Sequence, residues 1–364
     1  MTTIKVHLGK RSYPILVGKG ALSRVGALAR RVSRYSGVFA VSSQKVKRLY
    51  GGMVERACRA SGVAPAWLLV PDGEGAKTLA VLGRLLRSLA ASGASRDSCV
   101  IALGGGTVGD VAGFAAAVYA RGIPVIQVPT TLLAQVDAAI GGKTGVDLPE
   151  GKNLAGSFHH PIAVLADTSV LATLPVRQFR SGLAEVVKYG VIRSPRLFSF
   201  LEKNTDSVLG RNPGVLGRLV SGCAAIKADV VSRDERESGL RLTLNFGHTI
   251  GHAIEAVSGY RILHGEAVSI GMVAAARISA GLGLCSPAVP GRLGRLLGRL
   301  GLPVDLPRGL SRVKMLKVMM RDKKKMGNRL RFVLTRSIGD VTVSDGVKQS
   351  EIFGMLAERG GNIS

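Results

Sequence analysis

Short apolar runs alternate with helical patterns over the first half of the chain. Five such runs each end at a turn signal, and two extended segments before them, TIKVHLG and SYPILVG, predict an opening hairpin around KR. Strands that are short and apolar throughout are typical of a parallel sheet covered by helices on both faces. The five runs are Val38–Ser43, Ala66–Pro71, Cys99–Gly106, Pro124–Thr130 and Ile162–Asp167.

The second half has a different pattern. Beyond the TLP at Thr173–Pro175 the strand signals fade, and only RLRFVL, which begins at Arg329, still reads as extended. We therefore predict an α/β domain with a parallel sheet over residues 1–170 and an all-α domain over residues 171–364. The helices of the second domain are expected at Gln178–Ile192, Pro213–Arg233, Phe246–Val257 and Glu266–Ala280.

Composition is that of a soluble globular protein. The 364 residues are 46% apolar, and the N-terminal segment has no continuous apolar stretch of the kind found in a signal peptide. The most apolar long stretch begins at Ala267, but it carries Arg277 and several Gly and Ser, so it predicts a buried helix and no membrane span. The four cysteines are widely spaced without a CxxC pair, which favours a reduced, cytoplasmic setting.

The chain is strongly basic, with a formal net charge of +26. This charge favours anionic partners such as phosphorylated metabolites, dinucleotides or nucleic acid, although most of the arginines are accounted for by a solvated basic surface. The run RDKKKMGNRLR, Arg321–Arg331, would suit nucleic acid. Aromatic residues make up only 4% of the chain and no nucleic-acid-binding motif is present, so we expect no nucleic-acid partner.

A glycine-rich turn ends one of the apolar runs. In ALGGGTVGD, residues Gly104, Gly106 and Gly109 fit the pattern G-x-G-x-x-G between a strand and a helix, where backbone N–H groups can bind a diphosphate. No acidic residue lies between Asp110 and Asp137, so the ribose-binding acid of an ordinary Rossmann unit is missing. The pattern indicates a nucleotide-binding fold of another kind.

The segment PTTLLAQVDAAIGGKTGVDLPEGKNLAGSF follows the next apolar run. It places two GK pairs and a lone Asp among glycines and apolar residues. Lys and Asn on glycine-rich loops after a parallel strand suit the recognition of phosphate and hydroxyl groups. The polar residues of interest are Thr130, Thr131, Asp137, Lys143, Lys152 and Asn153.

Three of the six histidines lie within seventeen residues, around LNFGHTIGHAIE and HGEAV. His248 and His252 share one face of a predicted helix with Glu255 close by, and His264 opens the next helix. Upstream, Glu185 and Lys188 share a face in the apolar segment SGLAEVVKYG. A single histidine on such a face is more often a core residue, but a carboxylate with two imidazoles has the composition of a catalytic zinc-type site. Spacing alone does not choose among the three histidines.

Six motifs, in order, carry a resemblance to a known family. They are GGGTVGDVAGFAAAVYARGI, QVPTTLLAQVDAAIGGKTGV, GKNLAGSFHHP, SGLAEVVKYGVI, LNFGHTIGHAIE and HGEAVSIGM. Together they resemble the 3-dehydroquinate synthase family over about residues 70 to 280. The resemblance implies an NAD-binding α/β domain, a helical domain that binds metal and substrate, and an active site in the cleft between them. It also implies catalytic use of NAD⁺, one divalent metal (zinc or cobalt), and a homodimer.

Carried over position by position, the resemblance implies roles for individual residues. The metal ligands would be Glu185, His248 and His264, and His252 would become a hydrogen-bonding or acid–base residue. The catalytic residues would be Lys143, Lys188, Lys227, Arg241, Asn245 and His252. Further substrate contacts would come from Asp137, Asn153, Lys324 of the DKK run, and Arg121 across the dimer interface. The residues that would hold NAD are Glu74, Lys77, Gly105, Gly106, Asp110, Thr130, Thr131, Lys143, Lys152 and Thr173.

Two positions depart from the family pattern, and both concern the NAD side. Ser43 stands after the second strand, where the family usually has an Asp that can hold the adenine ribose. Gln178 stands in LPVRQ, where the family usually has Glu. The resemblance therefore leaves room for weaker or altered cofactor contacts.

The activity implied by the resemblance is conversion of a phosphorylated keto-sugar acid, 3-deoxy-D-arabino-heptulosonate 7-phosphate, to 3-dehydroquinate and phosphate. The steps would be transient oxidation, β-elimination, reduction and aldol closure. Another sugar-phosphate cyclase and a metal-dependent polyol dehydrogenase of the same fold remain alternatives. The grouping of Arg241, Lys143, Lys227 and Asn153 favours a substrate that carries a carboxylate.

Overall fold

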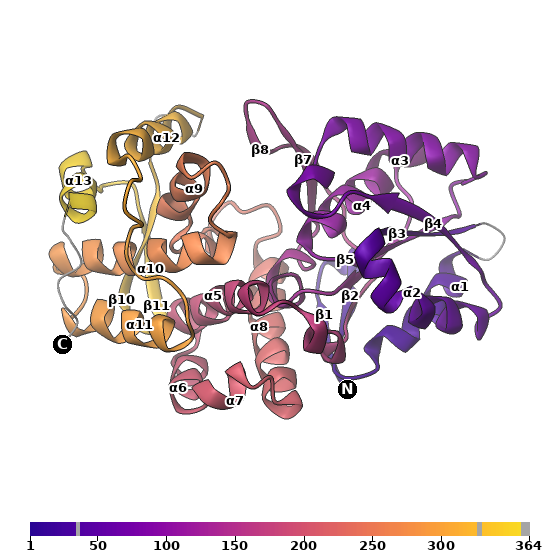
Figure 1. Cartoon of the computed structure of the whole chain (residues 1–364), viewed down its shortest axis with the longest axis horizontal. Helices are drawn as coiled ribbons and strands as arrows, with labels where there is room; N and C mark the ends of the chain where they lie inside the picture. Colours follow the sequence, from indigo (N-terminus) through magenta and orange to yellow (C-terminus); the bar gives the residue numbers. More distant parts are fainter. Residues whose placement is uncertain (34–36, 326–329, 358–364) are drawn as a thin grey trace. The chain divides into compact units, whose positions relative to one another are not determined.

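The computed structural model describes the backbone of residues 1–33, 37–325 and 330–357, without the side chains of 321–325, 353 and 355–357 (Figure 1). The chain forms two compact units. Unit 1 consists of Met1–Leu174 and Pro213–Glu235, and unit 2 consists of Pro175–Asn212 and the chain from Arg236 onward.

Unit 1 is built on a mixed, mainly parallel sheet, to which seven of the described strands contribute in the order β1-β2-β9-β6-β5-β3-β4. The opening hairpin pairs β1 with β2 antiparallel, and all the other neighbours in this sheet pair parallel. The α/β prediction is therefore confirmed. The strands are β1 (Thr2–Val6), β2 (Tyr13–Val17), β3 (Val38–Ser43), β4 (Pro65–Val70), β5 (Cys99–Gly104), β6 (Val125–Pro129) and β9 (Ala163–Ala166).

Helices cover both faces of this sheet because its central strands are apolar on both sides. In β5, Val100 and Ala102 pack with α3 (Leu79–Ala91) and α4 (Gly106–Val118). The alternate residues Cys99, Ile101 and Leu103 pack with α1 (Val25–Val32) and α2 (Gln44–Arg59) on the opposite face. All six residues of β5 are buried, which explains why its sequence shows no polar alternation.

Helix α8 (Pro213–Arg233) belongs to unit 1, although it follows the first segment of unit 2 in the chain. It packs against β1, β2 and the π-helical turn η5 (Ala134–Ala138). The first break between the units falls at Leu174, close to the predicted division at residue 170. The predicted single boundary at residue 170 nevertheless assigns α8 to the second domain, whereas α8 packs on unit 1.

A second hairpin lies in the glycine-rich segment that the sequence indicated as loops. Strands β7 (Lys143–Leu148) and β8 (Gly151–Phe158) pair antiparallel. Gly145 and Gly156 are opposite each other, and a Cβ at Gly156 would lie 2.2 Å from the Thr144 carbonyl oxygen. Glycine lowers the strand propensity of a sequence, yet here it permits the close approach of the two backbones, so the propensity-based prediction missed the hairpin.

Unit 2 is mainly helical. Its core around α9 and α10 includes apolar residues of α12, of α13 and of a short hairpin, β10 (Phe332–Ser337) with β11 (Asp340–Ser344). The prediction of an all-α domain was therefore wrong in this detail, because the FVL of RLRFVL, Phe332–Leu334, pairs with β11 across the turn at Gly339. Arg329, at the start of RLRFVL, lies outside the described residues. The helices are α5 (Val176–Arg193), α6 (Pro195–Lys203), α7 (Thr205–Leu209), α9 (His248–Val257), α10 (His264–Gly281), α11 (Ala288–Arg299), α12 (Arg312–Lys325) and α13 (Gln349–Ala357).

Glycines allow α5, α9 and α10 to pack at backbone contact. A Cβ at Gly265 of α10 would lie 1.8 Å from the carbonyl oxygen of Ser181 in α5. A Cβ at Gly271 of α10 would lie 2.0 Å from the carbonyl oxygen of Gly247, the residue before α9. Neither contact has room for a side chain, so these glycines set the spacing of the three helices.

We expect Gly265→Ala to lower the free energy of unfolding by about 2–3 kcal/mol, because the added methyl group must displace the backbone of α5. Gly281→Ala, at the end of the same helix, is the matched control, since a Cβ there meets no atom within 4 Å. Urea denaturation of both variants in the presence of a chelator measures the effect without a contribution from bound metal. Equal stability of the two variants would contradict this account of the packing.

Candidate active site

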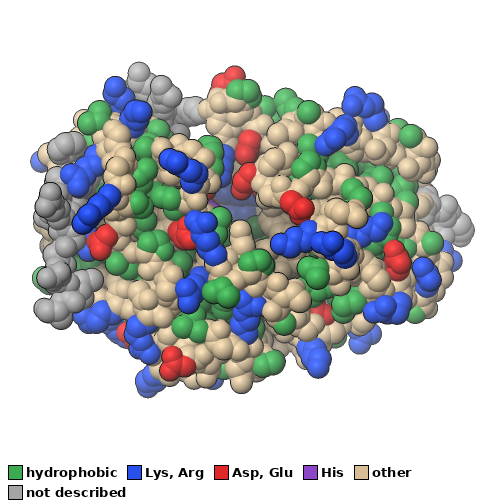
Figure 2. Space-filling view, in the orientation of Figure 1, with side chains coloured by type: hydrophobic (Ala, Val, Ile, Leu, Met, Phe, Trp, Pro, Cys, Tyr) green, Lys and Arg blue, Asp and Glu red, His purple; other side chains and the backbone are tan. Residues whose placement is uncertain are grey.

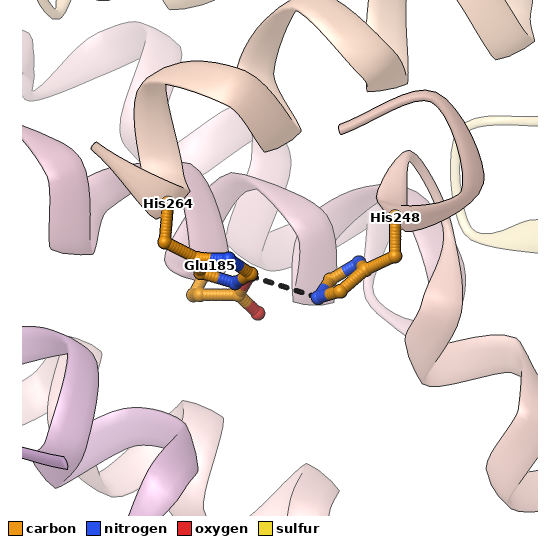
Figure 3. Close-up of side chains that lie close together, drawn as sticks. All are labelled: Glu185, His248 and His264. Carbon is orange, nitrogen blue, oxygen red and sulfur yellow. Dashed lines mark ion pairs between the residues drawn. The ribbon is translucent and has the colours of Figure 1, made fainter. Parts of the chain in front are cut away.

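Glu185, His248 and His264 come from three different helices and converge in unit 2 (Figure 3). Glu185 lies within α5, while His248 and His264 are the first residues of α9 and α10. Nε2 of each histidine lies 3.6 Å from Oε1 of Glu185. The potential ligand atoms of the three residues all lie within 4.8 Å of one another.

These separations fit a divalent metal. Two ligand atoms at about 2.0–2.2 Å from a tetrahedral zinc ion lie about 3.3–3.6 Å apart, which is the spacing of the two imidazoles from Glu185. A set of two histidines and one glutamate leaves a coordination position for substrate, as catalytic zinc sites do. The residues present therefore fit a catalytic metal.

The electrostatic surroundings of the two histidines differ. Burial, with the nearby charge of Lys188, holds the pKa of His248 well below its usual range, so this imidazole is neutral and able to bind a cation. Burial also lowers the pKa of His264, but the carboxylates of Glu185 and Glu255 outweigh it and raise the value to about 9. Lys188 forms a buried ion pair with Glu185 one turn earlier on α5.

Glu255 is a functional candidate to which the sequence reasoning gave no role. Its Oε2 lies 3.1 Å from Nδ1 of His264, and the side chain is buried. A carboxylate on the second ring nitrogen fixes the tautomer and orientation of a ligating histidine. The signal was present in the sequence, because Glu255 lies one helical turn after His252 and two turns after His248.

His252 lies beside the three metal-ligand candidates. Its ring centroid is 5.3 Å from that of His248 and 6.0 Å from that of His264, and the residue is exposed. His252 also forms a second candidate metal group with Glu255 and His264. Glu255 already contacts Nδ1 of His264, so the arrangement favours the group with Glu185 as the metal site.

Two further candidates of unit 2 lie on the turn η7 (Leu240–Asn245) before α9. Arg241 is only 1% exposed, which is rare for an arginine and indicates that neighbouring groups compensate its buried charge. The side-chain amide of Asn245 donates to Oε1 of Glu237 at 2.9 Å. Arg241 and Asn245 thus lie shortly before the metal-ligand candidate His248 in the chain.

In unit 1 the glycine-rich turn lies where the sequence predicts it, between β5 and α4. Backbone and side chains pack closely around it: a Cβ at Gly105 would lie 3.1 Å from Cγ2 of Thr131, and one at Gly106 would lie 3.1 Å from Cβ of Ala138. The Thr130 N–H donates to the Gly104 carbonyl. Neither glycine has free room for a side chain, so the backbone passes closely packed from β5 into the N-terminus of α4.

A charged cluster lies at the start of α4. Nζ of Lys77 lies 2.8 Å from Oδ2 of Asp110 and also donates to the side chain of Asn153. Burial raises the pKa of Asp110, and the Lys77 ammonium opposes that rise. The bond from Lys77 to Asn153 of β8 joins the β7–β8 hairpin to this cluster, and within the hairpin the Asn153 N–H donates to Asp147 of β7. Lys152 lies 3.8 Å from Glu74. The structure thus brings together five candidates from three sequence regions: Glu74, Lys77, Asp110, Lys152 and Asn153.

A second pairing in unit 1 joins α8 to the turn η5. Nζ of Lys227 donates to both the carbonyl oxygen and Oδ1 of Asp137, each at 2.7 Å. These two candidates are far apart in the sequence, and only the packing of α8 on unit 1 makes them neighbours.

The remaining candidates are less enclosed. Lys143 is exposed at the start of β7, and Arg121 is exposed with a positive φ of 67°. The Thr173 hydroxyl bonds to that of Tyr50, and Ser43 accepts a hydrogen bond from the Val46 N–H at the start of α2. Gln178 is exposed on α5, and the Lys324 side chain lies outside the described residues.

Both the sequence and the structure of this chain are similar to those of known proteins. Residues 67–181 match the N-terminal domain of 3-dehydroquinate synthase, and residues 182–325 match its C-terminal domain. The chain belongs to the 3-dehydroquinate synthase family. A 3-dehydroquinate synthase of Geobacter metallireducens is 49% identical over 94% of this chain and 95% of that protein. One of Desulforamulus reducens is 45% identical over 98% of this chain and 100% of that protein.

Solved structures similar to this 3-dehydroquinate synthase family member include other cyclases. A 2-deoxy-scyllo-inosose synthase, complexed with carbaglucose-6-phosphate, NAD⁺ and Co²⁺, has a TM-score of 0.88 and 30% identity, with 98% of this chain and 99% of that one covered. A 2-epi-5-epi-valiolone synthase from Streptomyces hygroscopicus with NAD⁺ and Zn²⁺ has a TM-score of 0.87 and 30% identity, with 94% and 95% covered. None of the described helices is long and apolar enough to cross a membrane.

We expect Glu185→Gln, His248→Ala and His264→Ala each to lose bound metal and activity together, because three protein ligands leave no spare. His252→Ala should keep its metal while turning over slowly. Glu255→Gln should weaken metal binding by about ten- to a hundredfold through loss of the His264 partner. Metal content after dialysis, measured by atomic emission, checks these expectations. A His252→Ala protein without metal would make our ligand assignment wrong.

Proposed function

We propose that the chain converts 3-deoxy-D-arabino-heptulosonate 7-phosphate to 3-dehydroquinate and phosphate. The observation that carries this proposal is the convergence of Glu185, His248 and His264 in a chain of the 3-dehydroquinate synthase family. The reaction needs a cation to activate a substrate hydroxyl, and this donor set can hold one.

The proposed cofactors are NAD⁺ and one divalent metal, zinc or cobalt. When bound, the two supply a transient hydride acceptor and Lewis-acid activation of a substrate oxygen. The metal would be held by Glu185, His248 and His264. The NAD⁺ contacts that we propose are Glu74, Lys77, Gly105, Gly106, Asp110, Thr130, Thr131, Lys143, Lys152 and Thr173.

The substrate carries two anionic groups, a carboxylate and a phosphate, and the proposed contacts are correspondingly basic. Arg241 offers a planar fork of donors for one oxyanion, and Lys227 is already oriented by Asp137. Fixed cations hold the substrate in one orientation and stabilise the charge on the departing phosphate. The full proposed set is Arg121, Asp137, Lys143, Asn153, Lys188, Lys227, Arg241, Asn245 and Lys324.

His252 is our candidate for proton transfer. Its imidazole lies beside those of His248 and His264, and its residue is exposed, so it can exchange protons with solvent. Histidine is the side chain whose unperturbed pKa suits both gain and loss of a proton near neutral pH. Among the neighbouring metal-ligand candidates, Glu255 orients His264 through its Nδ1, and Lys188 forms an ion pair with the Glu185 carboxylate.

We further propose that residues 1–170 form the core of the NAD-binding domain, that residues 171–364 contribute the metal and most of the substrate contacts, and that the enzyme is a cytoplasmic homodimer. The position of Lys227 on α8 supports a correction to this division, since α8 lies in unit 1. Sedimentation equilibrium of the purified protein tests the dimer directly.

Other functions are less well supported. The similar cyclase structures are 30% identical to this chain, whereas the 3-dehydroquinate synthases reach 45–49% over nearly its whole length. Glycerol dehydrogenase of Schizosaccharomyces pombe, at 18% identity, shares the fold alone. On the face drawn in Figure 2, Lys and Arg side chains are scattered among acidic and apolar ones, without the single basic stripe typical of a nucleic-acid-binding surface.

The first test is turnover of the proposed substrate. Product and phosphate together contain the same atoms and electrons as the substrate, so the net reaction is redox-neutral. Purified protein with catalytic NAD⁺ should therefore release stoichiometric phosphate with no steady rise in NADH absorbance. Accumulation of NADH with turnover would identify a dehydrogenase, and faster turnover of glucose 6-phosphate would identify another cyclase.

A second test concerns Arg241. Arg241→Lys keeps the positive charge but loses the planar pair of donors, so kcat/KM for the phosphorylated substrate should fall at least about tenfold, equivalent to roughly 1.4 kcal/mol. NAD⁺ affinity, measured by direct titration, should barely change. The assignment of Arg241 to the substrate fails if kcat/KM stays near normal or if only NAD⁺ binding weakens.

A further inference from the structure

Two glycines, Gly141 and Gly142, lie between the candidate substrate residues Asp137 and Lys143, directly before Lys143. Gly141 and Gly142 both have positive φ, 102° and 69°, and both are buried. Strand β7 begins at the next residue, Lys143, whose side chain is exposed. A pair of glycines has more backbone freedom than any other dipeptide, so the direction in which Lys143 leaves this turn depends on what holds it.

The backbone of this turn is held from two sides. The Gly141 N–H donates to the Tyr13 hydroxyl of β2 at 3.0 Å. The Gly142 carbonyl oxygen accepts a hydrogen bond from the His159 N–H, just after β8, at 2.8 Å. The neighbouring ring of His160 fills the space over Gly142, because a Cβ built there would lie 2.7 Å from Nδ1 of His160. The same ring lies 5.8 Å from that of Tyr13, measured between centroids.

His160 is itself fixed by Glu235, just beyond the end of α8. Nε2 of His160 lies 2.9 Å from Oε1 of Glu235, and because a carboxylate only accepts, this nitrogen carries the hydrogen. Glu235 also accepts two hydrogen bonds from the Arg11 guanidinium, at 2.5 and 2.8 Å. These bonds from Arg11, together with that from His160, lower the pKa of Glu235 to about 2, so the acceptor stays charged at any working pH.

We propose that His160 is a positioning residue of the active site, which holds Gly142 in one conformation and thereby sets the direction of Lys143. The inference rests on the proposed role of Lys143 in binding the substrate. Arg11, Glu235 and His160 form a chain of contacts from the N-terminal segment and α8 to the glycine turn, and all of these residues belong to unit 1. Loss of the ring leaves a cavity beside two glycines, so Lys143 samples directions in which it misses the substrate.

A double-mutant cycle tests this role in the holoenzyme. His160→Ala should lower kcat/KM about tenfold, whereas His160→Gln, whose amide can still donate to Glu235, should stay within about threefold of the wild type. In a Lys143→Ala background, His160→Ala should change kcat/KM by less than about twofold, because a residue that acts through Lys143 has nothing left to position. Bound metal and the NAD⁺ dissociation constant, measured directly, should match those of the wild type.

His7→Ala is the matched control, since His7 is an exposed histidine in the same unit and should leave kcat/KM unchanged. If His160→Ala does not fold, Glu235→Gln takes its place in the cycle, because it keeps an acceptor for His160 but removes the charge. Its effect on kcat/KM should likewise disappear in the Lys143→Ala background. Multiplicative losses in the double variant, or wild-type kcat/KM in His160→Ala, would overturn the positioning role alone. A Lys143→Ala protein of normal activity would overturn the proposed role of Lys143 and this inference with it.

Discussion

The constraint on which unit 2 depends is the burial of the Glu185 carboxylate. The side chain is 0% exposed, and a charge so placed is costly unless opposite charge or a metal surrounds it. Lys188 provides an ion pair from the same helix, and His248 and His264 approach from two others. The site thus gathers one ammonium and two imidazoles around a single buried carboxylate, and loss of Lys188 would remove its ion-pair partner.

Such a convergence requires helices that pack unusually closely. Gly265 follows His264 directly, and its contact with Ser181 brings the start of α10 onto α5. Gly247 precedes His248, and its contact with Gly271 brings the start of α9 onto α10. Two of the three metal-ligand candidates are therefore neighbours in sequence of the glycines that set the spacing. The same short motifs therefore set both the spacing of the helices and the positions of two ligand candidates.

Unit 1 presents polar groups at one end of a sheet that is apolar on both faces. The turn after β5 carries the glycines, and the β7–β8 hairpin brings Asn153 to Lys77 and Asp110. Helix α8 then returns to this unit and supplies Lys227 to Asp137. Polar residues gather in this way without interrupting the buried strands, because loops and a returning helix carry them.

The sequence alone determined the parallel strands, the approximate limits of four helices and the glycine turn, because each depends on local periodicity and on residues with particular backbone freedom. It also predicted a metal site in the region of three histidines, and the family resemblance selected Glu185, His248 and His264 as its ligands. Spacing could not make that selection, since His248 and His252 are equivalent on an isolated helix and Glu185 is distant in the chain. Only the tertiary structure decided that Glu255 accompanies His264, that the β7–β8 segment is a hairpin, and that α8 and its Lys227 belong to unit 1. Each of these results depends on contacts between residues far apart in sequence, whose energy no local pattern records.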